Sequence, residues 1–369
     1  MAPTECRADK YHRGVRLGLL PMTNYKCVYG MQAMIKIVTL VLCLFALNLQ
    51  SQAQDLLVYN GKSGPGLGKH IVLIAGDEEY RSEEALPMLA KILAVRHGFK
   101  CTVLFSLNPT DGTIDPNNRS NIVGLEELER ADMLVLFTRF RELPDAQMKY
   151  FDNFLRSGKP ILGIRTATHA FSFEKNKQSP YTQWDWRSEE WVGGFGQQVL
   201  GATWPRSGGH HGEHGKESTR GVINTRLKSH PILKGVGDIW GPTDVYGVFN
   251  LPADAQVLVY GQVLEGMRPT DKPVAGPKND PMTPLVWIRN YTAEGGKTSR
   301  VICSTIGSAV DFESEGLRRL TVNAVYWALG LERRIRARSD VDYVGDYQPS
   351  YFGEQGFKKG VKPSNLKFP

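Results

Sequence analysis

The stretch from Gly158 to Phe171 constrains the fold more than any other part of the chain. It runs Gly-Lys-Pro-Ile-Leu-Gly-Ile-Arg-Thr-Ala-Thr-His-Ala-Phe. The apolar run Pro160 to Ile164 follows a turn, which is typical of a strand covered on both faces. Gly163 permits close backbone packing, and Thr166 or Thr168 can cap a helix that follows. The stretch therefore predicts a buried strand, a sharp turn and the start of a helix.

Strands and helices alternate along the chain before this stretch. We expect strands at 70–75, 100–105 and 132–137, and helices at 82–96, 125–130 and 143–156. This alternation, with strands that are continuous apolar runs, predicts an α/β fold built on a parallel sheet with helices on both faces. Ligands bind outside the carboxyl ends of the strands in such sheets, which places Arg165, Thr166 and His169 at the binding edge.

The second half of the chain is less regular. We expect further strands near 221–225, 256–260, 285–289 and 300–305, and a closing helix at 314–329. The domain then spans residues 70–332, and residues 333–369 form a C-terminal tail that wraps over it or is partly ordered. No Gly-x-Gly-x-x-Gly follows the first strand, so a dinucleotide-binding fold is not supported.

The N-terminal segment is typical of a targeting signal. Met34-Ile-Lys36 is a short basic start, residues 37–49 are apolar, and Ser51-Gln-Ala53 offers small residues for cleavage. This pattern predicts a signal peptide at 34–53, and a secreted or periplasmic protein after cleavage near Ala53. The apolar run of 13 residues is shorter than the roughly 20 that span a bilayer, so we expect no permanent membrane anchor. Residues 1–33 have no clear pattern and are interpreted as an extension from a start codon placed too early.

The charge of the chain argues against nucleic-acid binding, and its cysteines argue against redox chemistry. Without residues 1–53 the chain has 39 basic and 36 acidic residues and no concentrated basic face with stacking aromatics. Nucleic-acid binding is therefore disfavoured. Cys101 and Cys303 both lie in apolar strand-like runs, where buried thiols are commoner than disulfides, and no Cys-x-x-Cys supports redox chemistry.

Six motifs occur in an order and spacing that are specific together. They are Gly76-Asp-Glu-Glu-Tyr-Arg-Ser-Glu83, the stretch that ends Gly163-Ile-Arg-Thr-Ala-Thr-His169, His230-Pro-Ile-Leu233, Asp244-Val-Tyr246, Thr283-Pro-Leu-Val-Trp-Ile-Arg289 and Tyr326-Trp-Ala-Leu-Gly330. In these motifs the chain resembles the ThuA-like (trehalose utilisation) family, a branch of the class I glutamine amidotransferase-like fold. The resemblance covers about residues 70–332. It implies a flavodoxin-like sheet with a pocket at the carboxyl edge, and it does not define a reaction.

The resemblance also excludes one reaction. The amidotransferase elbow is Gly-x-Cys-x-Gly, and Gly163-Ile-Arg-Thr-Ala167 stands in its place. Arg165 occupies the position of the nucleophile, and a protonated guanidinium cannot attack. The partner histidine expected after the last strand is missing, because Ile306-Gly-Ser-Ala-Val-Asp311 stands there. ThuA-like proteins often carry histidine at the Arg165 position, so the elbow departs from that pattern too. Hydrolysis of glutamine by a Cys-His pair is therefore not expected.

The catalytic candidates lie at the same sheet edge. Arg165 can hold a carboxylate, a phosphate or a polarised carbonyl, and the alternative is a structural ion pair with Asp77 or Glu79. His169 is either a general base or a satisfied, half-buried histidine. Asp77, Glu78 and Glu79 follow the first strand, and one of them, with Asp77 and Glu79 as the candidates, could take protons or bind hydroxyls. Solvated loop charge is the alternative and is favoured for at least two of the three. Asp311, just after the last strand, is a second possible acid.

The histidines near residue 210 have the chemistry of metal ligands. His210, His211 and His214 could bind zinc or another divalent metal, although the spacing differs from His-Glu-x-x-His and glycines flank the group. Two alternatives stay open. One is a mobile polar loop, and the other is a substrate-binding loop without a metal. No other cofactor is indicated.

The remaining candidates concern substrate binding. Trp184 and Trp186 could stack on sugar rings, although packing in the core is the common role of tryptophan. Asp244 and Tyr246 are candidates through the family resemblance alone, and Thr166 lies beside Arg165 in the elbow.

These residues lead to one main hypothesis and two alternatives. The main hypothesis is an exported ThuA-like protein that binds or processes a small polar ligand, a sugar or keto-sugar derivative, by hydrolysis, elimination or isomerisation. A non-catalytic binding or scaffold protein is the first alternative. The second is a metal-dependent hydrolase that uses the loop His210–His214. The sequence leaves the oligomeric state open.

Overall fold

The computed structural model describes residues 56–205 and 209–368. The expected extension 1–33 and signal peptide 34–53 lie outside these residues. Over the described ranges, none of the helices is both long enough and apolar enough to cross a membrane.

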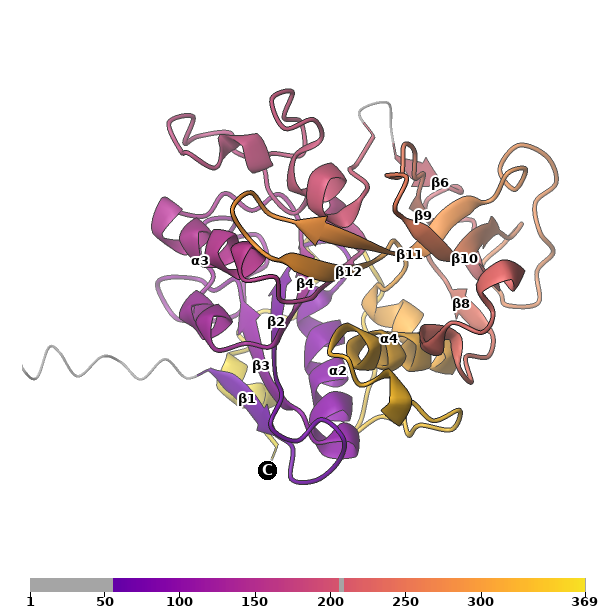
Figure 1. Cartoon of the computed structure of the whole chain (residues 1–369), viewed down its shortest axis with the longest axis horizontal. Coiled ribbons are helices and arrows are strands. Elements are labelled where there is room, and N and C mark those ends of the chain that lie inside the picture. Colours follow the sequence, from indigo (N-terminus) through magenta and orange to yellow (C-terminus); the bar gives the residue numbers. More distant parts are fainter. Residues whose placement is uncertain (1–55, 206–208, 369) are drawn as a thin grey trace, which may run out of the picture. The chain divides into compact units, whose positions relative to one another are not determined.

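The core of the fold is one ten-stranded mixed sheet (Figure 1). Its order across the sheet is β1-β3-β2-β4-β5-β12-β11-β10-β7-β8. The bounds are β1 Leu57–Asn60, β2 His70–Gly76, β3 Lys100–Phe105, β4 Met133–Thr138, β5 Ile161–Ile164, β7 Thr219–Ile223, β8 Ile239–Gly241, β10 Gln256–Val263, β11 Thr283–Thr292 and β12 Thr298–Ser304. A separate two-stranded sheet joins β6 His210–His211 to β9 Val245–Tyr246.

The parallel half of the sheet contains β3, β2, β4, β5 and β12. All residues of β2, β4 and β5 are buried, which explains their continuous apolar sequences. The predicted α/β, flavodoxin-like fold is confirmed. The other half, from β11 to β8, is antiparallel, and β1 adds an antiparallel edge strand that the sequence prediction missed.

Helices cover both faces of the sheet. Helices α2 Ser82–His97 and α4 Glu315–Ala328 pack on one face of the sheet. Their buried side chains form one hydrophobic cluster with sheet residues that include Leu73 of β2 and Val103 of β3. Helix α3 Asp145–Arg156 packs on the other face. Its buried residues Met148, Phe151, Phe154 and Leu155 recur at helical spacing and form one apolar stripe.

Short helices fill the connections. The 3₁₀ helices are η1 Leu125–Glu129, η2 Arg165–His169, η3 Thr182–Trp184, η5 Thr225–Leu227, η6 Pro231–Leu233, η7 Ala309–Glu313, η8 Glu332–Arg334 and η9 Pro363–Leu366, and η4 Gly196–Leu200 is a π-helix. The element after β5 is therefore one 3₁₀ turn, not the α-helix that the sequence predicted. The N-cap position of this turn is Ile164, which has no side-chain hydrogen bond to offer. Thr166 and Thr168 lie inside the turn and therefore do not cap it.

The C-terminal tail folds back along the domain. The Tyr347 hydroxyl donates to the Ala309 carbonyl at 2.7 Å, and the Ser350 hydroxyl donates to Glu84 at 2.9 Å. Near the C-terminus the Tyr59 hydroxyl of β1 donates to the Leu366 carbonyl at 2.6 Å. Figure 1 shows this yellow part of the chain beside β1. The tail therefore covers the outer side of α2, which explains why that helix is buried almost all round.

Candidate functional site

The elbow after β5 holds Arg165 in an unusual backbone conformation. Its φ of 47° lies in the left-handed region, which is rare for a residue with a side chain. A side chain at position 163 would collide with its neighbours, because a Cβ atom added to Gly163 would lie only 2.7 Å from Cδ1 of Leu200. The sharp turn aims the guanidinium into the protein, where Arg165 is fully buried. Such strained residues persist where the surrounding structure holds them, and they cluster at functional sites.

The guanidinium of Arg165 is engaged by protein groups. Its two terminal nitrogens donate to the Asp244 carbonyl at 3.1 and 3.0 Å, and Nη1 also donates to the Thr243 hydroxyl at 3.1 Å. Nη1 lies 3.6 Å from the Asp311 carboxylate. The alternative interpretation of Arg165, a structural ion pair, named the wrong partner, because the carboxylate beside it is that of Asp311 and not that of Asp77 or Glu79. Arg165 is thus a positioning residue for the segment at Asp244.

Asp311 is itself fully satisfied. It accepts hydrogen bonds from the Thr243 hydroxyl at 2.8 Å and from the Gly307 and Ser308 amides at 3.0 and 2.9 Å. The side chain is completely buried. Asp311 therefore serves as the counter-ion of Arg165, and its contacts leave it little freedom to act as an acid on a ligand.

One carboxylate, Asp244, joins two histidines. Nδ1 of His210 and Nδ1 of His214 both contact its oxygens, the second at 2.9 Å. Burial raises the pKa of Asp244, but the hydrogen bond from His210 and the charge of Arg165 outweigh burial and hold that pKa below its usual range. An ionised carboxylate only accepts hydrogen bonds, so both Nδ1 atoms carry protons. We name these three residues the His210–Asp244–His214 cluster.

The backbone explains which histidines join the cluster. His210 pairs with Tyr246 and His211 with Val245 across β6 and β9. Successive side chains of a strand point to opposite faces, so His211 lies on the other face from His210. Gly212, with φ of 105°, then turns the chain so that His214 returns to the cluster. Among the described residues, ligand-type atoms of His210, His214 and Asp244 lie within 4.8 Å of one another, and His211 is not part of this group.

Glu79 forms the rim of the cluster. One of its oxygens lies 2.9 Å from Nη1 of Arg139, and the other lies 3.8 Å from Nε2 of His214. Burial raises the pKa of Glu79, and the nearby Arg139 opposes this effect only in part. Glu79 and Asp244 therefore have pKa values that are shifted in opposite directions, although both are carboxylic acids.

Asp77 and Thr166 lie beneath this rim. Asp77 is fully buried and accepts hydrogen bonds from the Glu79 amide at 2.7 Å, from the Tyr80 amide and from the Thr166 hydroxyl. These bonds fasten the loop after β2 to the elbow after β5. The structure thus places Asp77 and Thr166 as supports for Glu79.

Aromatic rings enclose the inner side of the cluster. His169 packs between Trp204 at 4.8 Å, Phe140 at 5.1 Å and Tyr246 at 5.4 Å, measured between ring centroids. Trp204 also lies 5.1 Å from the ring of His210. Burial, together with the charge of Arg139, holds the pKa of His169 well below its ordinary value, so its imidazole is neutral. Within the described residues, the buried hydroxyl of Tyr246 has no hydrogen-bond partner.

The two candidate tryptophans take different places. Trp184 is buried and stacks on Phe195 at 5.6 Å in the core beside α3. Trp186 is half-buried and lies 5.8 Å from Phe140, whose ring in turn contacts His169. The structure therefore brings Trp186, but not Trp184, to the edge of the aromatic wall.

The C-terminal tail completes the site. The ring of Phe352 lies 4.7 Å from His214 and 5.5 Å from Tyr80, and the Gly353 amide donates to the Glu79 carbonyl at 2.8 Å. Sequence reasoning missed Phe352 and also Trp204. The position of Trp204, six residues before His210, was a usable signal, whereas nothing in the tail's composition singles out Phe352.

A scan against protein families matches residues 72–328 to ThuA, described as trehalose utilisation. The match covers well over half of the chain. The chain belongs to the ThuA family. The Arg165 elbow, Glu79 and the His210–Asp244–His214 cluster all lie inside the matched region.

Solved structures similar to this ThuA-family chain include two ThuA-like proteins. One is from Parabacteroides merdae, with 15% identity, a TM-score of 0.46 and coverage of 71% of this chain and 90% of that one. The other is from Bacteroides uniformis, with 18% identity, a TM-score of 0.40 and coverage of 73% and 94%. A search of curated proteins finds no match.

Proposed function

We propose that this ThuA-family chain binds a sugar or keto-sugar derivative at the His210–Asp244–His214 cluster and processes it by acid–base catalysis. One observation carries the proposal, namely the single buried carboxylate that orients two accessible imidazoles. The side chains of His210 and His214 are 33% and 40% exposed, whereas Asp244 is fully buried behind them. The family's description supports a sugar as the ligand.

The proton positions at the cluster define a base. Each Nδ1 donates a hydrogen bond to Asp244, and an imidazole with its proton on Nδ1 has a lone pair on Nε2 whenever it is neutral. A base oriented by a carboxylate in this way is the arrangement that general-base catalysis uses. We assign His210 as the base and Asp244 as the residue that positions it.

Glu79 is the corresponding acid. Burial raises the pKa of Glu79, whereas the pKa of Asp244 is lowered, so of the two carboxyl groups Glu79 carries a proton more readily. In a keto-sugar, the carbonyl acidifies the neighbouring C–H bond. Nε2 of His210 takes that proton, the electron pair forms an enolate and then expels the glycosidic oxygen on the next carbon, and Glu79 protonates that oxygen. The atoms balance as an elimination that yields an unsaturated ketone and a free alcohol.

Turnover of trehalose and of its keto derivative, followed by proton NMR, tests this function. Wild type is expected to consume the keto-sugar, and Asp244→Asn is expected to slow that reaction by at least tenfold because His210 loses its ionised partner. Glu213→Gln is the matched control, since Glu213 lies in the same loop, is exposed and forms an ion pair with the exposed Lys216. Equal rates for wild type and Asp244→Asn would remove the cluster from catalysis. Saturable binding without turnover would instead support a non-catalytic binding protein.

A metal-dependent hydrolase is the second candidate, because ligand atoms of His210, His214 and Asp244 lie within 4.8 Å of one another. Two imidazoles and a carboxylate suit zinc and other divalent metals. A metal bound by both Nδ1 atoms would replace the two protons that they now share with Asp244. Metal analysis after dialysis against zinc tests this candidate. One equivalent in wild type and none in Asp244→Asn would support it, and no retained metal in wild type would dismiss it.

We further propose that the protein is exported after cleavage near Ala53, on the basis of the basic start, apolar run and small residues in segment 34–53. N-terminal sequencing of the mature protein is expected to begin near Gln54. A mature N-terminus upstream of Met31 would contradict the proposal.

A further inference from the structure

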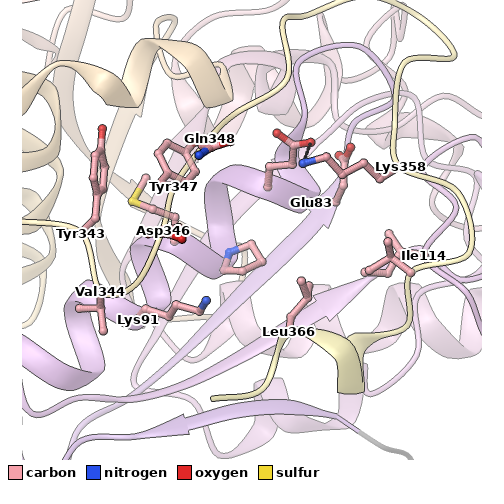
Figure 2. Close-up of a pocket in the computed structure, with 14 residues that line it drawn as sticks. Glu83, Lys91, Ile114, Tyr343, Val344, Asp346, Tyr347, Gln348, Lys358 and Leu366 are labelled. Carbon is pink, nitrogen blue, oxygen red and sulfur yellow. Dashed lines mark ion pairs between the residues drawn. The ribbon is translucent and has the colours of Figure 1, made fainter. Parts of the chain in front are cut away.

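We propose that the cavity between α2 and the C-terminal tail is a second binding site, for a small ligand with an apolar body and a protonated amine. The cavity has a volume of about 200 Å³ and is separate from the His210–Asp244–His214 cluster (Figure 2). Since one water takes about 30 Å³ in the liquid, this volume corresponds to roughly six or seven waters or one small organic molecule.

The walls of the cavity are apolar over most of their extent. Helix α2 and the segment near Ile114 supply one side, and the tail supplies the other. Figure 2 shows Tyr343, Val344 and Lys91 at one end of the cavity and Glu83 and Lys358 at the other. The apolar and aromatic lining residues are Pro87, Met88, Ile114, Tyr343, Val344, Tyr347, Val361 and Leu366. Such a lining favours a hydrocarbon body over a fully polar ligand.

Glu83 is the polar group that selects the ligand. It is 8% exposed, and neither of its carboxyl oxygens has a hydrogen-bond partner in the part of the chain that the structure describes. The buried guanidinium of Arg81 lies 3.6 Å from one of these oxygens, close enough for an ion pair but without a hydrogen bond. Pro87 lies four residues later in α2 and has no N–H, so the backbone carbonyl of Glu83 also lacks its usual helical donor. A buried acceptor without a donor is costly, and a ligand that brings N–H groups removes this cost.

Three other charged groups of the wall, Glu84, Lys358 and Lys91, already have contacts within the protein. Glu84 accepts from the Ser350 amide and hydroxyl at 2.6 and 2.9 Å and lies 3.5 Å from Lys358. Lys91 lies 5.2 Å above the ring of Phe368. The wall carries three acids, Glu83, Glu84 and Asp346, against two lysines. Asp346 is exposed, whereas Glu83 is buried and its carboxyl oxygens accept no hydrogen bond from the described residues, so Glu83 is the acid of the wall that a protonated amine can reach as a new donor.

Binding of an amine is expected to change the protonation state of Glu83, which can be measured. Burial raises the pKa of its carboxyl to about 8, so the free protein holds Glu83 mostly neutral at pH 7. A protonated amine beside it favours the carboxylate, since an opposite charge lowers a carboxyl pKa. Binding of the amine therefore releases a proton from Glu83.

Isothermal titration calorimetry of the full chain with three probes tests the proposal. The probes are n-hexylamine, 1-hexanol and hexanoate, which share an apolar body and differ in the polar group. We expect hexylamine to bind saturably, at least tenfold more tightly than 1-hexanol, and hexanoate not to bind. Titrations of hexylamine in two buffers with different ionisation enthalpies at pH 7 are expected to show proton release.

Two variants and one control complete the experiment. Glu83→Gln keeps the shape of the side chain and is expected to weaken hexylamine binding at least tenfold and to abolish the proton release. Val344→Trp fills the cavity from the tail side and is expected to abolish binding of hexylamine and 1-hexanol. The control is Glu126→Gln, an exposed acid on η1, which is expected to bind like wild type. The proposal is overturned if hexylamine does not saturate wild type, or if it binds wild type and Glu83→Gln equally well.

Discussion

Arg165 and Asp311 form an ion pair in which both side chains are fully buried, with 3.6 Å between guanidinium and carboxylate. Arg165 stands at the elbow position where an amidotransferase carries its nucleophile, and Asp311 lies in the segment where the partner histidine would follow the last strand. At these two positions the structure has a buried structural ion pair. Arg165 also donates two hydrogen bonds to the backbone carbonyl of Asp244. These bonds join the elbow at the sheet edge to the His210–Asp244–His214 cluster.

Breaking this pair is expected to destabilise the fold. Arg165→Met leaves the Asp311 carboxylate buried without its counter-ion, which costs about 3–5 kcal/mol of unfolding free energy. Urea unfolding measures the loss. Arg130→Met is the control, since that side chain is 81% exposed and its pair with Glu127 contributes at most about 1 kcal/mol. A similar small loss in both variants would show that the buried pair is not a structural requirement.

The Asp244→Asn variant has a defined pH dependence. The folded pKa of Asp244 lies below its unfolded value, so its contribution is fully present above that value and is lost as the pH falls through the folded pKa. At pH 7 we expect Asp244→Asn to lose about 2 kcal/mol, the scale of a hydrogen bond to a charged group. The gap to wild type is expected to stay constant from pH 7 to 5 and to narrow at pH 3. Urea midpoints across this range check the prediction, and an unchanged gap at pH 3 would contradict it.

His169 is expected to destabilise the fold in mild acid. Its folded pKa is well below its ordinary value near 6.5, so the unfolded chain binds a proton first as the pH falls. Wild type should therefore lose stability relative to His169→Phe below pH 6.5, by about 1.4 kcal/mol per pH unit. Phenylalanine suits the surrounding rings of Phe140, Trp204 and Tyr246. Parallel stability curves for the two proteins between pH 6.5 and 5.5 would show that His169 is protonated in the folded state.

The tail is expected to contribute to the site through Phe352. Phe352→Ala removes the ring that packs on His214 and Tyr80, so His214 is held less firmly. We expect keto-sugar affinity to fall about fivefold to tenfold, equivalent to roughly 1–1.4 kcal/mol. Phe368→Ala is the control, because that tail residue packs on Tyr59 of β1 instead. If both variants bind the sugar like wild type, Phe352 has no part in the site.

The sequence predicted the features that depend on local pattern. Buried strands such as β2 and β5 are continuous apolar runs, and the elbow at Arg165 follows from the strand and glycines around it. The partners of the elbow could not be predicted, because they are distant in sequence. Arg165 and Asp244 are 79 residues apart, and only the pairing of β6 with β9 shows that His210 belongs to the cluster while His211 does not. The roles of Trp204 and Phe352 likewise depend on tertiary packing.

Calorimetric titration of trehalose into wild type and Asp244→Asn at pH 7 tests whether the His210–Asp244–His214 cluster binds a sugar, because trehalose lacks the carbonyl that the elimination requires. We predict saturable binding to wild type with one site per chain, and at least tenfold weaker binding to the variant. Equal affinity for the two proteins, or no binding to wild type, would contradict it.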